Sequence, residues 1–122
     1  MDLRDFSALR FLYAFPPAEG TEGLWRPPVD LYETAAEVVV ELEIPGAAPG
    51  SLRIVCNGDR LLIEGATEPR ALAPADGRFL CLERASGPFR RVLDLPGRVD
   101  RERAAARYRD GILTITLPKA RA

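Results

Sequence analysis

The chain has 122 residues, enough for one domain with a substantial core but not for two. Its 17 basic and 18 acidic side chains give a net charge of −1, so composition provides no electrostatic attraction to nucleic acid or to an anionic membrane. There is no histidine and there are only 2 cysteines, which excludes a Cys₂His₂ or Cys₄ zinc site within one chain and removes the commonest general base.

Targeting and cofactor signals are also missing, and we expect a cytoplasmic protein. No stretch approaches the ~18 apolar residues of a membrane span, and Asp2 and Asp5 stand where a signal peptide would be basic. Cys56 and Cys81 are too few for a disulfide framework and are expected to be reduced, buried thiols. No phosphate-binding glycine loop is present. We therefore expect no cofactor, no metal, no nucleic-acid partner and no membrane span.

Residues 1–24 read as a short N-terminal arm rich in aromatic side chains, at Phe6, Phe11, Tyr13 and Phe15. Part of the apolar pattern has helical spacing, so the arm is expected to be partly helical or flexible before Pro16-Pro17 ends it. So many aromatic groups outside the strand pattern either pack on the chain's own domain or a sister subunit, or stay exposed as an interaction site. Both alternatives remain open from the sequence.

From Trp25 onward the pattern is that of short strands separated by turns. Alternation puts Val38, Val40, Leu42 and Ile44 on one face and glutamates on the other, as in a half-buried antiparallel strand. Asn57-Gly58 and Asp110-Gly111 are hairpin turn signals. The expected strands are 29–33, 37–44, 52–56, 60–65, a strand containing Phe89 to Leu95, a short strand before the Asp110-Gly111 turn, and 112–117 before Pro118.

The acidic face of residues 37–43 suggests two other kinds of site. Glu41 and Glu43 could form a cation site or an acid–base pair, but alternating strand carboxylates diverge in a row and imply neither converging ligands nor a deep cleft. We expect a solvated face there and no enzyme activity.

A long excursion from Ala66 to Ser86 interrupts the strand pattern. Within it, residues 78–84 have strand character, with Phe79, Leu80 and Leu82 close together. A strand within a long loop can pair with a sheet other than its own, as in strand exchange between subunits.

Five ordered motifs resemble the small heat shock proteins, the α-crystallin-domain family, of the bacterial and archaeal type. They are Val29-Asp30-Leu31-Tyr32-Glu33; Ile44-Pro45-Gly46; Leu61-x-Ile63-x-Gly65; Glu83-Arg84 with Gly87, Phe89 and Arg91; and Ala106 with Asp110-Gly111, Leu113 and Pro118-Lys119. The family's usual Glu-Arg after the glycine of the third motif, Gly65, is Ala66-Thr67 here. The resemblance, from about Pro28 to Lys119, implies an all-β, immunoglobulin-like antiparallel β-sandwich at 25–119, with the arm before it and a truncated tail at 120–122. It also implies that residues 99–109, whose composition would otherwise favour a helix, form a loop with one helical turn and then a strand at 104–108.

This resemblance implies an ATP-independent holdase chaperone that binds partly unfolded proteins and prevents their aggregation. The alternative is a non-chaperone adaptor, a co-chaperone-like module that binds one specific partner through the same sandwich. By resemblance, the client-contacting residues are Phe6, Phe11, Tyr13, Phe15 and Trp25. A homodimer would form by strand exchange through residues 78–84, with Phe79, Leu80, Cys81, Leu82, Glu83 and Arg91 at its interface.

Arg91 shares parity with Phe89 and Leu93, which places a guanidinium among apolar neighbours. Such an arginine needs a carboxylate, for which Glu83 or an acidic residue of the partner subunit is the candidate, unless it extends to water at the surface. The resemblance also implies an inter-dimer groove at Leu52, Ile54, Ala104 and Ala106, made shallower because alanine stands at 104 where the family commonly has isoleucine. In members of the family that form large assemblies, an I-x-I motif in the tail inserts into this groove on a neighbouring dimer. No such motif follows Lys119 here, so the resemblance leaves assembly beyond the dimer open.

Overall fold

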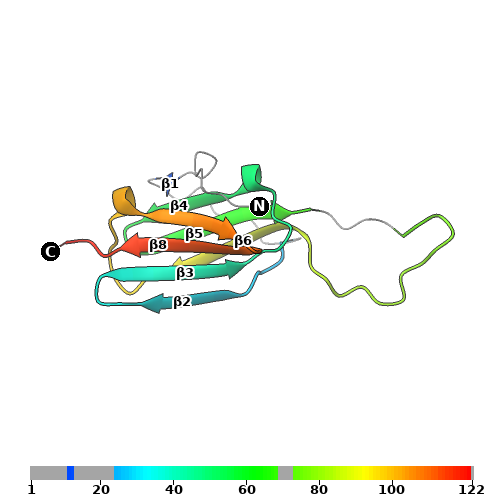
Figure 1. Ribbon diagram of the computed structural model, residues 1–122, viewed down its shortest axis with the longest axis horizontal. Helices are drawn as coiled ribbons and strands as arrows, with labels where there is room; N and C mark the ends of the chain where they lie inside the picture. Colours follow the sequence, from blue (N-terminus) through cyan, green and yellow to red (C-terminus); the bar gives the residue numbers. More distant parts are fainter. Residues whose placement is uncertain (1–10, 13–23, 69–72, 122) are drawn as a thin grey trace.

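The computed structural model describes residues 24–68 and 73–121, together with the backbone of residues 11–12. These residues form two four-stranded sheets stacked face to face (Figure 1). One sheet has the order β1-β4-β5-β6 and the other β2-β3-β8-β7. The strands are β1 (Phe11–Leu12), β2 (Val29–Glu33), β3 (Glu37–Glu43), β4 (Arg53–Asn57), β5 (Arg60–Thr67), β6 (Gly87–Asp94), β7 (Ala105–Arg109) and β8 (Ile112–Pro118).

All strand pairs are antiparallel except β1 with β4, which is parallel. The core lies between the sheets and consists of alternate residues of the central strands, such as Val40, Ile54, Ile63 and Ile115, each with an exposed fraction of 0%. The expected β-sandwich is thereby confirmed. Within the described part of the chain, no helix is long and apolar enough to cross a membrane.

The turn between β7 and β8 has the backbone that its sequence predicts, since Asp110 and Gly111 have φ values of 54° and 79°. The β4–β5 turn lies one residue later than the predicted Asn57-Gly58: Asn57 ends β4 opposite Arg60, and the turn is formed by Gly58, with φ of 67°, and Asp59. The segment before β7 is also as predicted, with one 3₁₀ turn, η3 (Arg101–Arg103), leading into the strand. A second 3₁₀ turn, η2 (Pro49–Ser51), precedes β4.

Tyr108 closes one end of the sandwich with its hydroxyl group. The side chain is buried, its hydroxyl donates to the Ile44 carbonyl at 2.7 Å, and it accepts from the Ala47 N–H at 3.3 Å. Replacing Tyr108 by phenylalanine is expected to lower the free energy of unfolding by about 1 kcal/mol, because the buried Ile44 carbonyl loses the closer of its two donors and keeps only the Ala47 N–H. Urea unfolding measures this, with Tyr32→Phe on exposed β2 as the control. Equal stability of the two variants would contradict the assignment.

The outermost strands define two open sides of the sandwich. β6 and the entry to β2 lie next to each other, because Arg91 on β6 donates from Nη1 to the Pro27 carbonyl at 2.7 Å. On the other side, β7 forms the edge of its sheet, whereas β4 is bonded to β1. Open strand edges carry unpaired N–H and C=O groups and can add a further strand.

Candidate protein-interaction surface

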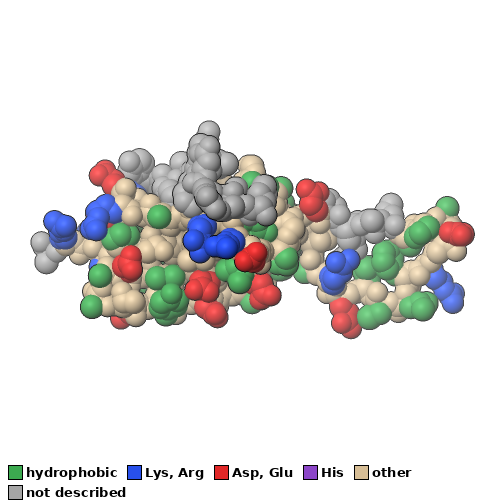
Figure 2. Space-filling view, in the orientation of Figure 1, with side chains coloured by type: hydrophobic (Ala, Val, Ile, Leu, Met, Phe, Trp, Pro, Cys, Tyr) green, Lys and Arg blue, Asp and Glu red, His purple; other side chains and the backbone are tan. Residues whose placement is uncertain are grey.

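The connection between β5 and β6 is the most prominent surface feature of the molecule. Its described part leaves the end of the sandwich as a long extended loop (Figure 1). Apolar side chains on it stand clear of the sandwich (Figure 2), and Leu80 is 86% exposed, with Phe79 and Leu82 about half exposed. Side chains of this size rarely stand free in a monomer unless they meet another chain.

The strand predicted at residues 78–84 is absent from the single chain. These residues form no regular structure, since a β-strand needs a neighbouring backbone to bond with and no described strand lies beside them. The segment is therefore strand-forming in composition, but none of the strands that the structure describes pairs with it. Pairing with a second subunit stays a prediction.

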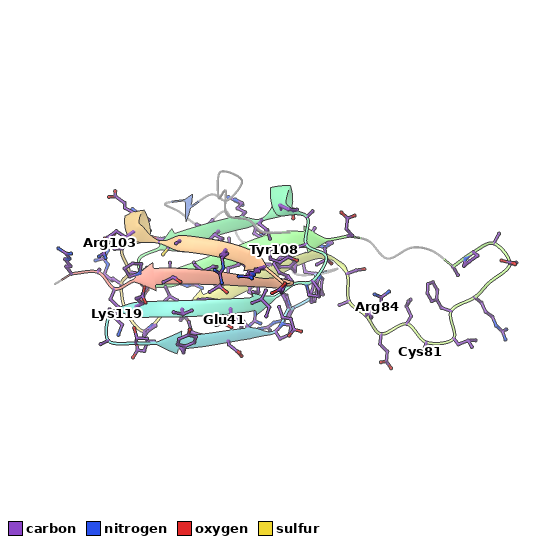
Figure 3. All side chains as sticks on the ribbon, in the orientation of Figure 1. Glu41, Cys81, Arg84, Arg103, Tyr108 and Lys119 are labelled. Atoms are coloured by element: carbon purple, nitrogen blue, oxygen red, sulfur yellow. The ribbon has the colours of Figure 1, made fainter. Side chains whose placement is uncertain are left out.

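The two cysteines occupy opposite environments. Cys81 is exposed on the loop (Figure 3), with its Sγ 3.4 Å from Glu83 Oε1, which corrects the expectation that both thiols are buried. Cys56 is buried in the core, and burial raises the pKa of its thiol despite the opposing charge of Arg101.

This contrast predicts how the thiols react. At pH 8 an aromatic disulfide reagent should rapidly modify Cys81 and leave Cys56 unmodified, because the buried thiol is both shielded and protonated. Unfolding in guanidinium should make both react. Rapid modification of both thiols in the native protein, quantified by intact mass, would contradict the burial of Cys56.

The base of the loop is fixed to the sandwich by several specific contacts. Thr67 Oγ1 accepts from the Gly87 N–H at 3.0 Å, at the last pair of the β5–β6 ladder. Trp25 donates from its indole nitrogen to the Gly87 carbonyl at 3.1 Å, and its ring meets Phe89 edge to face with centroids 5.8 Å apart. The loop therefore projects from a rigid support.

An open hollow of about 600 Å³ lies at this base. Trp25, Pro28 and Pro45 supply apolar surface, and residues 84–86 of the loop form another part of its lining. It is open to solvent and bordered by Glu43, Glu68 and Arg84. We regard it as the junction of loop and sandwich.

Arg91 lies on the open side formed by β2 and β6. As predicted from parity, it faces inward beside Phe89 and Leu93. Its Nε is buried without a hydrogen-bond partner, and desolvation, followed by the charge of Arg26, lowers the pKa of its guanidinium. A pair with Glu83 of the same chain is not formed, since the recorded partner of Arg91 is the Pro27 carbonyl. The loop carries Glu83 away from the sandwich, so the pairing prediction is wrong within one chain, and a carboxylate from a partner subunit stays a prediction.

The same open side presents apolar groups from β2. Leu31 faces inward opposite Val40 but remains 40% exposed, because β2 is the last strand of its sheet. Tyr32 is half exposed on the outer face. Three features of the described residues thus lie in one region: the β2 edge, which pairs with no described strand, the partly exposed Leu31, and Arg91 with its unsatisfied Nε.

The residues predicted to contact clients are only partly within the described structure. Phe6, Tyr13 and Phe15 lie outside the described residues, and Phe11 is described by its backbone alone, in β1. Residues 11–12 form strand β1, and the rest of the arm predicted to be partly helical or flexible, except residue 24, lies outside the described residues. Trp25 is half-buried against Phe89, so its role in client contact, like that of the arm, stays a prediction.

The residues predicted to line an inter-dimer groove lie mainly in the core. Leu52, Ile54 and Ala106 are buried, and Ala104 packs against them. The backbone edge of β4 next to Ile54 is bonded to β1. Nothing in the sequence pattern indicates this parallel pairing, because two residues of an aromatic arm carry no register signal. Use of this edge by another subunit stays a prediction.

Comparison with known proteins gives a consistent result. Residues 30–122 match the family model described as "Hsp20/alpha crystallin family". Small heat shock protein C4 of Rickettsia felis is 31% identical over 103 residues, which cover 84% of this chain and 63% of that protein. The 17.8 kDa class II heat shock protein of Zea mays is 32% identical over 75% of this chain and 56% of its own length. The chain thus spans less than two thirds of these curated relatives.

Solved structures agree with the sequence relatives. Heat shock protein 16.0 from Schizosaccharomyces pombe superposes with a TM-score of 0.68 at 28% identity, covering 80% of this chain and 93% of that one. The fold and the order of the sequence motifs therefore lead to the same set of proteins.

Proposed function

Because the chain belongs to the Hsp20/alpha crystallin family, the small heat shock proteins, we propose that it is an ATP-independent holdase that binds partly unfolded proteins and keeps them from aggregating. Its two cysteines are free, which suits a reducing compartment, and we propose that it acts in the cytoplasm.

The observation that carries this proposal is the exposed apolar loop, in a molecule that also has an open sheet edge at β2. An unfolding protein exposes apolar surface and unpaired backbone groups, and covering the apolar part is worth ~25 cal/mol per Å². The loop offers apolar side chains, and the β2 edge offers backbone donors and acceptors. Binding of this kind requires no bond chemistry and no nucleotide.

We further propose that the loop also forms a homodimer, with residues 78–84 of each subunit added to the β2 edge of the other. This arrangement would give residues 78–84 the neighbouring strand that they lack within one chain. It would bring a loop carboxylate, Glu83, toward Arg91 of the other subunit, where a buried Nε lacks an acceptor. The proposal predicts that Glu83→Gln weakens the dimer more than Glu37→Gln on β3.

Light scattering tests the holdase activity. Two unrelated clients, the insulin B chain released by reduction and heat-unfolded malate dehydrogenase, are mixed with increasing amounts of the full chain without ATP. Suppression of scattering for both clients is expected near equal mass ratios. An inert globular protein at the same mass concentration is the control.

The outcomes separate the holdase from an adaptor. If a several-fold excess of the chain reduces light scattering no more than the inert control protein does, the holdase proposal is overturned. That result would favour an adaptor with one specific partner. If suppression is present, full-length protein with serine at Phe6, Phe11, Tyr13 and Phe15 should suppress less well. Unchanged suppression would remove the arm from the client-binding surface and leave the loop as the candidate.

A further inference from the structure

The outer face of the sheet β2-β3-β8-β7 carries opposite charges on its two sides. One cross-strand row runs from β2 to β7 through Asp30, Glu41, Thr114 and Arg107, which are in register. These side chains point away from the core, because the neighbouring position Val40 points into it. Figure 2 shows acidic side chains over β2 and β3 and basic side chains over β7.

The two ends of this row have no partner among the described residues. Asp30 and Arg107 are both exposed, and neither side chain forms an ion pair or a hydrogen bond with another residue that the structure describes. Three strand spacings, about 14 Å, separate them, which is too far for an ion pair within one chain. Both charges are therefore available to another molecule.

The next row along the strands has complementary shapes at its two ends. It runs from β2 to β7 through Tyr32, Val39, Thr116 and Ala105. Tyr32 is half exposed at the β2 end. The β7 end has small side chains, and an open hollow of about 320 Å³ lies there, lined by Ala105, Ala106, Arg107, Thr114 and Thr116. The face thus has a large aromatic group on one side and a hollow on the other.

Both properties fit a second copy of the same face. A two-fold axis that lies between two facing sheets, parallel to their strands, exchanges the β2 side with the β7 side and keeps each row opposite itself. Asp30 of each copy then faces Arg107 of the other, and Tyr32 faces the hollow. An axis across the strands would place β7 over β7 and β2 over β2, where like charges repel.

We propose that this face is a contact between two copies of the chain, packed sheet to sheet with β2 of each copy over β7 of the other. The strand-exchange dimer uses the edge of β2 and not this face, so the contact would join such dimers. Four strands ~4.8 Å apart and ~20 Å long cover about 400 Å², half of the ~800 Å² that each partner gives to a standard interface. The contact is therefore weak and depends on concentration. Ile112, one row nearer the β7–β8 turn, lies outside the two rows.

Charge reversal in the full chain tests the proposal by sedimentation velocity at a series of concentrations. Arg107→Asp and Asp30→Arg should each weaken the association of dimers at least tenfold, because the two-fold axis repeats each change at two places. Mixing the two variants in equal amounts should restore it, since one row then has acidic ends and the other basic ends. Arg103→Asp, at an exposed arginine on η3, is the matched control and should associate like the unaltered chain.

Chemical crosslinking tests the direction of the axis. In a Cys81→Ser background, Tyr32→Cys and Ala105→Cys are made singly and together, while Cys56 stays in the core. A short bismaleimide should join two chains at least fivefold faster in the double variant than in either single one, because position 32 of one copy faces position 105 of the other. Circular dichroism checks that each variant is folded.

Four results would overturn the proposal. These are an unaltered chain in which dimers do not associate, association that ignores both charge reversals, a mixture of the two variants that associates no better than either alone, and single-cysteine variants that crosslink as fast as the double one. No client protein is used, so failure here is distinct from failure of the holdase proposal.

Discussion

Replacing Gly65 by alanine is expected to lower the free energy of unfolding by about 2 kcal/mol. An added Cβ would lie 2.8 Å from Cζ of Phe89 and 2.9 Å from Cδ2 of Leu52. Both neighbours are buried, and Phe89 is also held by Trp25, so neither can move without disturbing the support of the loop. For a domain of this size the loss corresponds to a fall in melting temperature of roughly 8–16 °C.

A matched control is available at Gly97. No atom lies within 4 Å of the Cβ position there, and its backbone does not require glycine. Gly97→Ala should change the melting temperature little. Calorimetry of the two variants measures the difference. If Gly65→Ala has the same melting temperature as Gly97→Ala, the close packing of β5, Leu52 and Phe89 does not limit the stability of the domain.

Changing Leu80 and Leu82 to aspartate is expected to weaken the proposed dimer by at least about 100-fold, since each buried leucine contributes roughly 1.5–3 kcal/mol and each tenfold change in affinity is 1.4 kcal/mol. The melting temperature of the sandwich should change little, because both side chains are exposed in the single chain. Sedimentation velocity at a series of concentrations gives the dissociation constant.

Ile112→Asp supplies the control for added charge. Ile112 is an exposed apolar residue on β8, on a face that the proposed dimer does not use. This variant should dimerise like the unaltered chain. A loop variant that keeps its dissociation constant would show that residues 78–84 are not the subunit contact.

The sequence predicted the sandwich because alternation and turn chemistry act locally. Residues such as Val38, Val40 and Leu42 define the inner face of β3 without reference to any other strand, and they are buried as expected. Asp110-Gly111 fixes the β7–β8 hairpin through two positive φ values. Even the inward position of Arg91 follows from parity with Phe89.

Features that depend on distant parts of the chain were not predictable in this way. The partner of Arg91 is a carbonyl at Pro27, far away in sequence, and no pattern identifies a backbone acceptor. β1 pairs with β4 through two residues of the arm. The alternating pattern predicts β4 by itself and does not indicate which segment pairs with its edge. Residues 78–84 have a strand composition, but whether they form a strand depends on a neighbouring backbone, and no described strand of the chain pairs with them.

The loop between β5 and β6 is joined to the sandwich at its base, by Thr67 and Gly87, and its described residues project from there. Changes in its length cost the fold little, since doubling a flexible loop costs only about 0.6 kcal/mol. In the proposed dimer, two related subunits could assemble together only if the loop of each is long enough to reach the open β2 edge of the other. Loop length would then decide which related subunits form mixed dimers, and it could change without a change in the sandwich.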